Sequence, residues 1–339
     1  MLLKITHDTH LTYSEPISEA LMELRMAPLQ TSDQYRLSFD LAVGPPAGVT
    51  SYFDWLGNPV HFFTIRGFHR EIRIVATSVV ETGRPRRHPD QTPDPRDRWP
   101  LRPDAYDYSV YDFLRFGGPV VDSPTLRRLT EMLRPAEEMA LAELAMRMIR
   151  LIDEQFTYEQ GVTTAASPIT DLLEHGRGVC QDFTHLMIGL ARALKIPARY
   201  VSGFLHPHAD VNGEPETADA ARFRGYSQTH AWCELLFPSE GWVGFDATNR
   251  CAVGANFVKL AVGRDYRDVA PSRGVYRGKA VETIGASVHS VELPDMPREL
   301  AAERVRSLPI AVYAEGAVPQ IHQVNQQQEI PQQEAQQQQ

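Results

Sequence analysis

Cysteine is scarce in this sequence, and its three cysteines, Cys180, Cys233 and Cys251, are spaced like neither a zinc site nor a disulfide framework. At least one thiol is therefore expected to be free. No uncharged apolar run reaches the ~18 residues that a membrane-spanning helix requires. The N-terminus also lacks the basic start and apolar run that mark a secretory signal. These absences together predict a cytoplasmic protein.

Positive charge is also in deficit, with 34 Lys and Arg against 43 Asp and Glu and a formal net charge of -9. This balance does not favour a phosphate backbone or an anionic membrane surface, so neither nucleic acid nor membrane is expected as a partner. The composition, 42% hydrophobic and 23% charged, is that of a folded protein with a large core. At ~150 residues per domain, the length indicates about two domains.

The N-terminal part of the chain reads as strands. Residues 1–82 contain short segments rich in Val, Ile, Phe and Tyr, which are separated by turn residues. Regular spacing of this kind is typical of a β-sandwich. Residues 83–105 are dense in proline and charge, so they are predicted to form a linker or an extended surface arm.

The middle of the chain, residues 106–292, is predicted to form a second domain. Ser123 followed by Pro124 is a helix start, and residues 137–156 carry apolar side chains at helical intervals. Three strands, ARYVSGFL, HAWCELLF and GWVGFDAT, follow a further helix that begins at Cys180. Residues 293–339 lose this pattern and are predicted to be a tail that ends in a disordered glutamine-rich segment.

Cys180 is the most informative cysteine because it stands at the first turn of a predicted helix. Apolar residues recur along this helix with the spacing of one buried stripe; they are Phe183, Leu186, Met187, Leu190 and Leu194. The N-terminus of a helix favours a thiolate, whose pKa there falls from ~8.5 into the range ~3.5–7.5. Gly176 and Gly178 would leave the sulfur approachable. A small, half-buried cysteine that merely begins a helix is the alternative interpretation.

A thiolate nucleophile needs an imidazole to move a proton, and the imidazole needs a carboxylate or amide to fix its tautomer. His230 begins the predicted strand HAWCELLF, and Asp246 ends the next strand, in GWVGFDAT. If these strands form an antiparallel pair, the two side chains can meet across it. The sequence therefore predicts a site of Cys180, His230 and Asp246.

Four segments, GRGVCQDFTHL, IPARYVSGF, THAWCELLF and GWVGFDATN, resemble in this order the core of the transglutaminase-like superfamily. The resemblance implies an α+β protein with a papain-like core, in which helices pack on an antiparallel sheet, preceded by the β-sandwich-like N-terminal domain of bacterial members. It also implies that Cys180 is the nucleophile, His230 the general base and acid, and Asp246 the carboxylate that orients the imidazole.

Other candidate residues follow from weaker signals. The segment FTYEQG makes Tyr158 a candidate for binding the oxyanion, with a packed aromatic side chain as the alternative. The segment GRDYRDVAPSRGVY makes Arg264, Asp265 and Tyr266 candidates for lining the cleft, with a structural ion pair as the alternative. Trp232 is a candidate for shielding the cleft or for packing in the core.

Several polar residues near these segments are expected to be structural. Asp182 lies in the first helical turn, where a carboxylate caps free N–H groups. His185 is expected to lie in the core or behind the site, off the face of the sulfur. His206, His208 and Asp210 form only a thin metal-binding signal in a polar loop, so no metal site is predicted. The mechanism implied by the triad requires no metal or organic cofactor.

The predicted chemistry is acyl transfer through a thioester. Resolution by water makes the protein a cysteine protease or amidase, a hydrolase acting on a protein or peptide substrate. Resolution by an amine makes it a protein-glutamine gamma-glutamyltransferase, which is the first alternative. The second alternative is a non-catalytic binding module, which this fold also supplies after loss of a triad member. The sequence does not indicate an oligomeric state.

Overall fold

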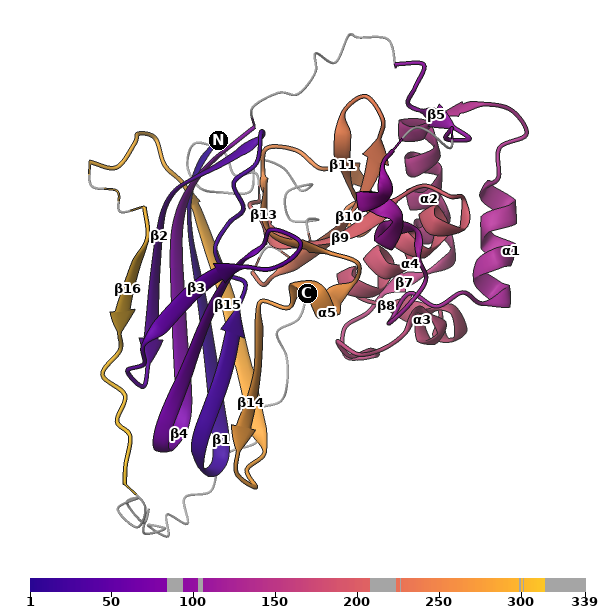
Figure 1. Ribbon diagram of the computed structural model, residues 1–339. Coiled ribbons are helices and arrows are strands. Elements are labelled where there is room, and N and C mark those ends of the chain that lie inside the picture. Colours follow the sequence, from indigo (N-terminus) through magenta and orange to yellow (C-terminus); the bar gives the residue numbers. More distant parts are fainter. Residues whose placement is uncertain are drawn as a thin grey trace, which may run out of the picture.

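The computed structural model describes residues 1–83, 94–102, 106–207, 224–225, 227–298, 300 and 302–314. Two parts lie side by side in Figure 1: a sheet of long strands, and a second sheet covered by helices. The protein is therefore α+β, as the sequence predicted. None of the helices in the described ranges has the length and apolar composition needed to span a bilayer.

The large sheet contains the strands of the N-terminal β-rich region together with three strands from the C-terminal part of the chain. Its strands are β1 (Leu2–Leu24), β2 (Gln34–Gly44), β3 (Val49–Phe53), β4 (Pro59–Thr82), β14 (Ser272–Arg277), β15 (Glu282–Glu292) and β16 (Arg304–Ser307). β1 and β4 form its antiparallel centre; β14 and β15 pair with the other edge of β1, and β2 and β3 with the other edge of β4. Hydrogen bonds join all of these strands into one sheet, where the sequence suggested the two sheets of a sandwich.

β1 and β4 are longer than expected, because each joins two segments that the sequence separates by turn residues. The register of β1 against β4 shifts between Thr12 and Ile17 and again before Glu19. Pro16 lies in this irregular stretch, where its missing N–H breaks no regular ladder. Opposite it, Gly67 has a φ of 101°, a conformation that favours glycine. The turn residues therefore interrupt the pairing without ending the strands.

The C-terminal strands correct the predicted domain boundary at residue 292. β14 and β15 fall within residues 106–292, yet they pair with β1, from Leu3 opposite Glu292 onward. β16, which falls within the predicted tail, pairs in parallel with β2. Without β14 and β15, this edge of β1 would be unpaired and open to association with another strand. The pattern within a strand does not indicate which distant edge it joins, so the sequence could not reveal this pairing.

The second sheet holds five strands, in the spatial order β12 (Cys251–Ala252), β11 (Gly241–Asp246), β10 (His230–Phe237), β9 (Ala198–Leu205) and β13 (Phe257–Gly263). The helical segments are η1 (Tyr108–Leu114), α1 (Pro124–Leu133), α2 (Leu141–Gln155), α3 (Ile169–His175), α4 (Cys180–Ala193) and α5 (Tyr266–Val269). Two further pairs of short strands complete this part: β5 (Arg98–Trp99) with β6 (Met139–Ala140), and β7 (Thr157–Tyr158) with β8 (Arg177–Gly178).

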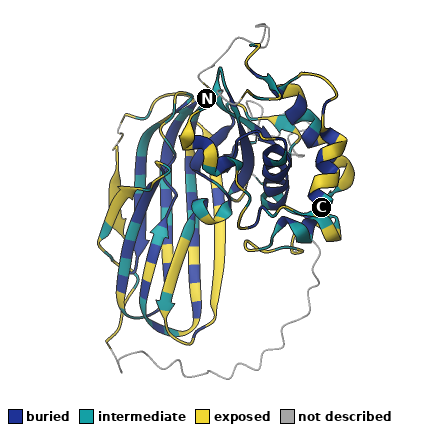
Figure 2. Ribbon diagram, turned by 45° about the vertical axis from the view of Figure 1, so that its right-hand side comes forward, coloured by how far each residue is buried: buried dark blue, intermediate teal, exposed yellow. Residues whose placement is uncertain are grey.

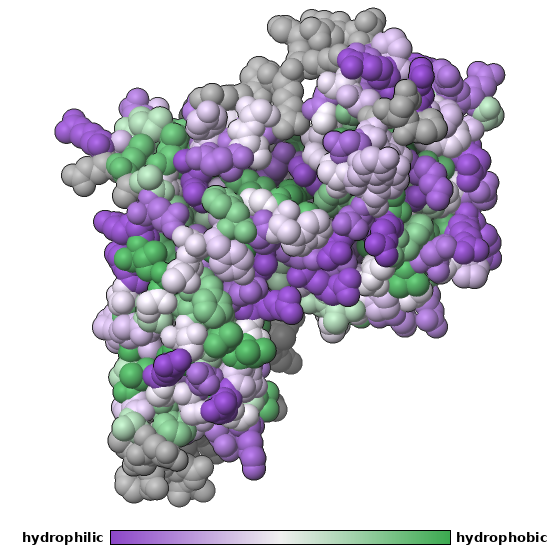
Figure 3. Space-filling view, viewed as in Figure 1, coloured by the Kyte–Doolittle hydropathy of each residue, from purple (hydrophilic) through white to green (hydrophobic). Residues whose placement is uncertain are grey.

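The helices form as the sequence predicts. The Ser123 hydroxyl accepts a hydrogen bond from the Leu126 N–H at 3.2 Å, and Pro124 begins α1. The predicted stripe of α4 is buried against α1, α2, β9 and β10. Figure 2 shows α4 as an almost wholly buried helix beside the second sheet. The outer surface of the helical part is mainly hydrophilic (Figure 3), as expected for amphipathic helices on a sheet.

Two amide side chains, one from β2 and one from the turn before β4, cover the free edge of β13. Gln34 Oε1 accepts the Lys259 N–H at 2.7 Å, and its Nε2 donates to the Lys259 carbonyl at 2.9 Å. Asn58 makes the same pair of bonds with Val262, at 2.8 and 2.9 Å. Both amides are buried. They take the place of a neighbouring strand and fix the second sheet to the N-terminal part.

Replacing Gln34 with Ala is expected to lower the free energy of unfolding by about 1–3 kcal/mol, because the Lys259 N–H stays buried without its partner, although the Lys259 carbonyl still accepts the Leu29 N–H at 2.9 Å. Urea unfolding of the whole protein measures this loss. Gln30 is a matched control, since its exposed amide makes the same two bonds with Arg36. Q30A should cost about 0.5 kcal/mol or less. An equal loss in the two variants would contradict the role of Gln34.

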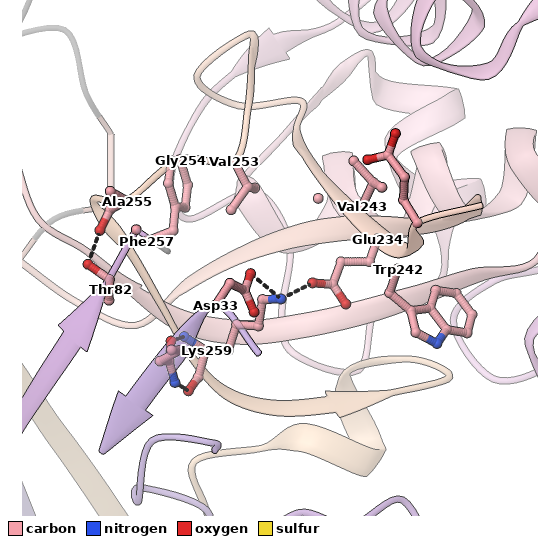
Figure 4. Close-up of a pocket in the computed structure, with 14 residues that line it drawn as sticks. Asp33, Thr82, Glu234, Trp242, Val243, Val253, Gly254, Ala255, Phe257 and Lys259 are labelled. Atoms are coloured by element: carbon pink, nitrogen blue, oxygen red, sulfur yellow. Dashed lines mark hydrogen bonds and ion pairs between the residues drawn. The ribbon is translucent and has the colours of Figure 1, made fainter. Parts of the chain in front are cut away.

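A cavity of about 330 Å³ lies at the same junction (Figure 4). Glu234 is fully buried beside it, between Arg199 at 2.6 Å and Lys259 at 2.7 Å, and Lys259 also approaches Asp33 at 3.5 Å. Burial alone would raise the pKa of Glu234, but the two cations lower it below its usual value. The charged side chains of Asp33, Glu234 and Lys259 at this cavity already pair with one another, and Cys180 does not line the cavity. The cavity therefore belongs to the domain junction.

Candidate active site

The half-buried Cys180 is the first residue of α4, as predicted. Asp182 fixes this end of the helix, because its Oδ2 accepts hydrogen bonds from the Val179 N–H at 2.8 Å and from the Thr163 hydroxyl at 2.6 Å. A Cβ on Gly178 would lie 2.7 Å from this oxygen, so the turn before the cysteine requires glycine. The capping role predicted for Asp182 is thus confirmed, and the thiol stands where backbone N–H groups are free.

His230 and Asp246 meet across the β10–β11 pair. Cys233 lies opposite Phe245 in this register, which brings the start of β10 diagonally across from the end of β11. His230 Nε2 donates to Asp246 Oδ2 at 2.7 Å, and both side chains are inaccessible to solvent. The predicted pair is therefore in contact, and no water competes for the bond.

The charge of Asp246 controls the protonation of His230. Burial alone would lower the pKa of His230, but the charge and hydrogen bond of Asp246, followed by contact with Cys180, raise it to about 10. Nδ1 of the ring is buried and makes no hydrogen bond with nitrogen or oxygen in the described part of the chain. Because Nε2 faces Asp246, Nδ1 is the nitrogen left for the thiol. The arrangement favours an imidazolium beside Cys180.

Asn249 is a site residue that the sequence did not reveal. Its Nδ2 donates to Asp246 Oδ2 at 2.7 Å and lies 3.2 Å from His230 Nε2. Asp246 Oδ1 accepts the backbone N–H groups of Thr248 and Asn249, at 2.9 and 3.2 Å. The carboxylate is therefore held in one orientation from both sides. An asparagine three residues after the aspartate was the available signal, but asparagine is also common in the turn that follows a strand.

Three tyrosines lie near enough to Cys180 for its charge to affect them. Tyr158 lies on β7, which pairs with β8 immediately before Cys180. Burial raises the pKa of Tyr158, Tyr200 and Tyr266, and the charge of Cys180 raises each of them further. All three phenols therefore stay protonated at neutral pH. The two candidates among them, Tyr158 and Tyr266, lie close to the sulfur.

The other two cysteines have different surroundings. Cys233 is wholly buried in the core, and burial raises its pKa well above the usual range. Burial and the charge of Asp246 raise the pKa of Cys251 to about 12. Both thiols therefore stay protonated at neutral pH, and neither has the helix N-terminus and imidazole that adjoin Cys180.

Two family models match parts of this chain. The model described as the transglutaminase-like superfamily matches residues 127–247, and the bacterial transglutaminase-like N-terminal region matches residues 3–81. The chain belongs to the transglutaminase-like superfamily. Cys180, His230 and Asp246 lie within the first matched range, and the second range covers the first strands of the large sheet.

Relatives of this transglutaminase-like chain match most of its length. It is 29% identical to the uncharacterized protein ML0607 of Mycobacterium leprae over 294 residues, which cover 86% of this chain and 99% of that protein. A crystal structure of a candidate cysteine protease from Cytophaga hutchinsonii has the same fold, with a TM-score of 0.66 and 24% identity over 88% of this chain and 93% of that one.

One relative carries a named activity. The protein-glutamine gamma-glutamyltransferase of Pseudomonas aeruginosa is 31% identical over 136 residues, which cover 40% of this chain and 20% of that protein.

The remaining predicted cleft residues of this transglutaminase-like core have structural surroundings. Trp232 is fully buried against Phe257, with ring centroids 5.3 Å apart, so it packs in the core and does not line an open cleft. Arg264 pairs with Asp268 at 2.8 Å. Asp265 caps α5 and pairs with Arg267 at 2.9 Å. The ion-pair interpretation therefore describes both of these residues.

The structure also describes two of the histidines considered in the sequence, His185 and His206. His185 is buried, and its Nε2 accepts the Tyr266 N–H at 3.1 Å, so it supports the segment behind the site. Burial lowers the pKa of His185 to about 3, which keeps its ring neutral. His206 Nδ1 lies 2.8 Å from the Ser290 hydroxyl. His208 and Asp210 fall outside the described residues.

Proposed function

We propose that this transglutaminase-like protein is a cysteine peptidase or amidase that hydrolyses a peptide-type bond in a protein or peptide substrate. The observation that carries the proposal is the buried contact of His230 with Asp246, beside a cysteine at a helix N-terminus. A buried ion pair of this kind gives a nucleophile at neutral pH without a metal or organic cofactor. We further propose a cytoplasmic location, with neither nucleic acid nor membrane as partner.

The reaction begins when the Cys180 thiolate attacks the carbonyl carbon, so that a C–S bond forms and the carbonyl electrons move to the oxygen. The Cys180 N–H and the Tyr158 hydroxyl stabilise this oxyanion. His230 then gives its proton to the amide nitrogen, the C–N bond breaks, and an amine leaves. Water attacks the resulting thioester while His230 takes its proton, and the C–S bond breaks to release the acid. Asp246 keeps its hydrogen bond with the ring throughout.

Transamidation is the second candidate, and the Pseudomonas aeruginosa relative supports it. An amine can replace water in the second half of the reaction only where the site binds the amine or excludes water, because water is present at about 55 M. Among the described residues near Cys180, the carboxylates are those of Asp182 and Asp246. Both already accept hydrogen bonds from other groups, so neither is available to hold an ammonium group. Hydrolysis is therefore the preferred outcome.

Incubation of the protein with a library of glutamine-containing peptides and a fluorescent primary amine tests the two outcomes. Mass spectrometry should find cleaved or deamidated peptides in excess of amine adducts, and C180A should form neither. An excess of adducts would replace hydrolysis by transamidation. If the wild type forms no product and no thioester, the chain is a binding module.

A further inference from the structure

Arg224 adjoins residues of the proposed site. Its guanidinium stacks over the Tyr158 ring, 4.6 Å from the centroid. The next residue, Gly225, has a φ of 90°, and a Cβ on it would lie 2.5 Å from His230 Nδ1. The backbone thus passes directly against the imidazole nitrogen that is left for the thiol. Only glycine fits there, so the chain places Arg224 beside the reacting groups.

The backbone of Arg224 is tied to the triad itself. Asn249 Oδ1 accepts the Arg224 N–H at 2.8 Å, and Asn249 Nδ2 donates to the Arg224 carbonyl at 3.3 Å. The same Nδ2 donates to Asp246 at 2.7 Å. A single amide therefore holds both the orienting carboxylate and the residue that carries the guanidinium. These hydrogen bonds fix the backbone of Arg224 relative to Asp246.

The guanidinium of Arg224 differs from its neighbours in charge pairing. Arg177, Arg264 and Arg267 each pair with a carboxylate, at 3.1, 2.8 and 2.9 Å. Arg224 is exposed and has no carboxylate partner within the described ranges of the chain. Guanidinium groups bind carboxylates in two-point contacts, and stacking on a ring leaves their N–H groups free to do so.

We propose that Arg224 is a specificity-determining residue that binds a substrate carboxylate next to the bond under attack. This inference rests on the proposed function and deepens it, because it names the substrate class: peptides or amides with an acidic group beside the scissile carbonyl. The Asn249 clamp and the Tyr158 ring hold the guanidinium for this contact. In a chain of net charge -9, it is a local cation that draws an anionic substrate to the site.

Two small alkylating reagents test the proposal without a known substrate. Iodoacetate and iodoacetamide differ by a carboxylate, and both transfer their methylene carbon to the thiolate while iodide leaves with the C–I electrons. The measurement is the ratio of their rates at Cys180 in the wild-type protein, in R224Q and in R224K. R224Q should lower the ratio of the iodoacetate rate to the iodoacetamide rate about fivefold, and R224K less. Added salt should lower the ratio in the wild type more than in R224Q.

Arg147 provides the matched control, because it pairs with Glu143 on the exposed side of α2 and R147Q removes the same charge. R147Q should leave the ratio at the wild-type value. Equal ratios in R224Q and wild type, or an equal fall in R147Q, would overturn the inference about Arg224. Failure of the proposed function looks different: iodoacetamide would then label Cys180 of the wild type no faster than Cys251.

Discussion

Replacing His230 with Ala is expected to slow the reaction of Cys180 with iodoacetamide about tenfold at neutral pH, and to reduce hydrolysis of a cleavable peptide about 10²- to 10⁴-fold. The imidazolium that favours the thiolate is lost, and no group remains to protonate the leaving amine. Mass spectrometry of the three cysteine peptides after timed labelling measures the first effect. Product release from a peptide found in the library measures the second.

The control for this change is H289A, because His289 is exposed on β15 in the large sheet. This variant should keep both rates. The wild type should also label Cys180 well before Cys233 and Cys251, whose thiols stay protonated at neutral pH because burial raises their pKa. Equal labelling of the three thiols, or an unchanged Cys180 rate in H230A, would count against the activated thiol.

Replacing Asp246 with Asn is expected to reduce hydrolysis by a comparable factor, about 10²- to 10⁴-fold, although the side chain keeps its size. Asp246 is the main group that raises the pKa of His230 against the effect of burial. Without its charge, burial dominates and lowers the pKa of the ring, which becomes neutral and loses its fixed tautomer. The rates of peptide hydrolysis and of Cys180 alkylation, measured side by side, test this expectation.

Two further variants serve as comparisons for D246N. N249A removes one support of the carboxylate and leaves its charge, so it should reduce hydrolysis by only about tenfold. D153N removes a carboxylate that pairs with Arg250 on the surface, and it should have no effect. A D246N variant as active as D153N would show that the buried contact with His230 is structural.

The places of Cys180, His230 and Asp246 in the fold could be predicted from the sequence, because each residue stands at a boundary that the local pattern reveals. Cys180 begins an amphipathic helix, and His230 and Asp246 lie at the ends of two successive strands. Antiparallel pairing of neighbouring strands is a local event, so it brings these ends together without further information. The same reasoning correctly placed Asp182 as a cap.

Features that depend on contacts between distant residues could not be predicted in this way. The pairing of β14 and β15 with β1 joins residues more than two hundred positions apart, as in Leu3 opposite Glu292. The contacts of Gln34 with Lys259 and of Asn249 with Arg224 involve amides whose sequence context is that of ordinary turns or strands. Trp232 was assigned to either cleft or core, because alternation along a strand does not say which face is covered.

We expect His230 to stay protonated at neutral pH because the carboxylate of Asp246 stabilises its charged form. Ring-nitrogen NMR shifts of labelled histidine, with the His230 signals assigned from H230A, follow this proton directly as the pH is raised. The ring should keep its proton from about pH 6 to about pH 9 and lose it near its pKa of about 10, well above the ordinary value of 6.5. C180S should lower the midpoint while leaving it above 6.5, since Asp246 remains. A wild-type midpoint at or below 6.5 would mean that burial outweighs the carboxylate, and it would contradict the account.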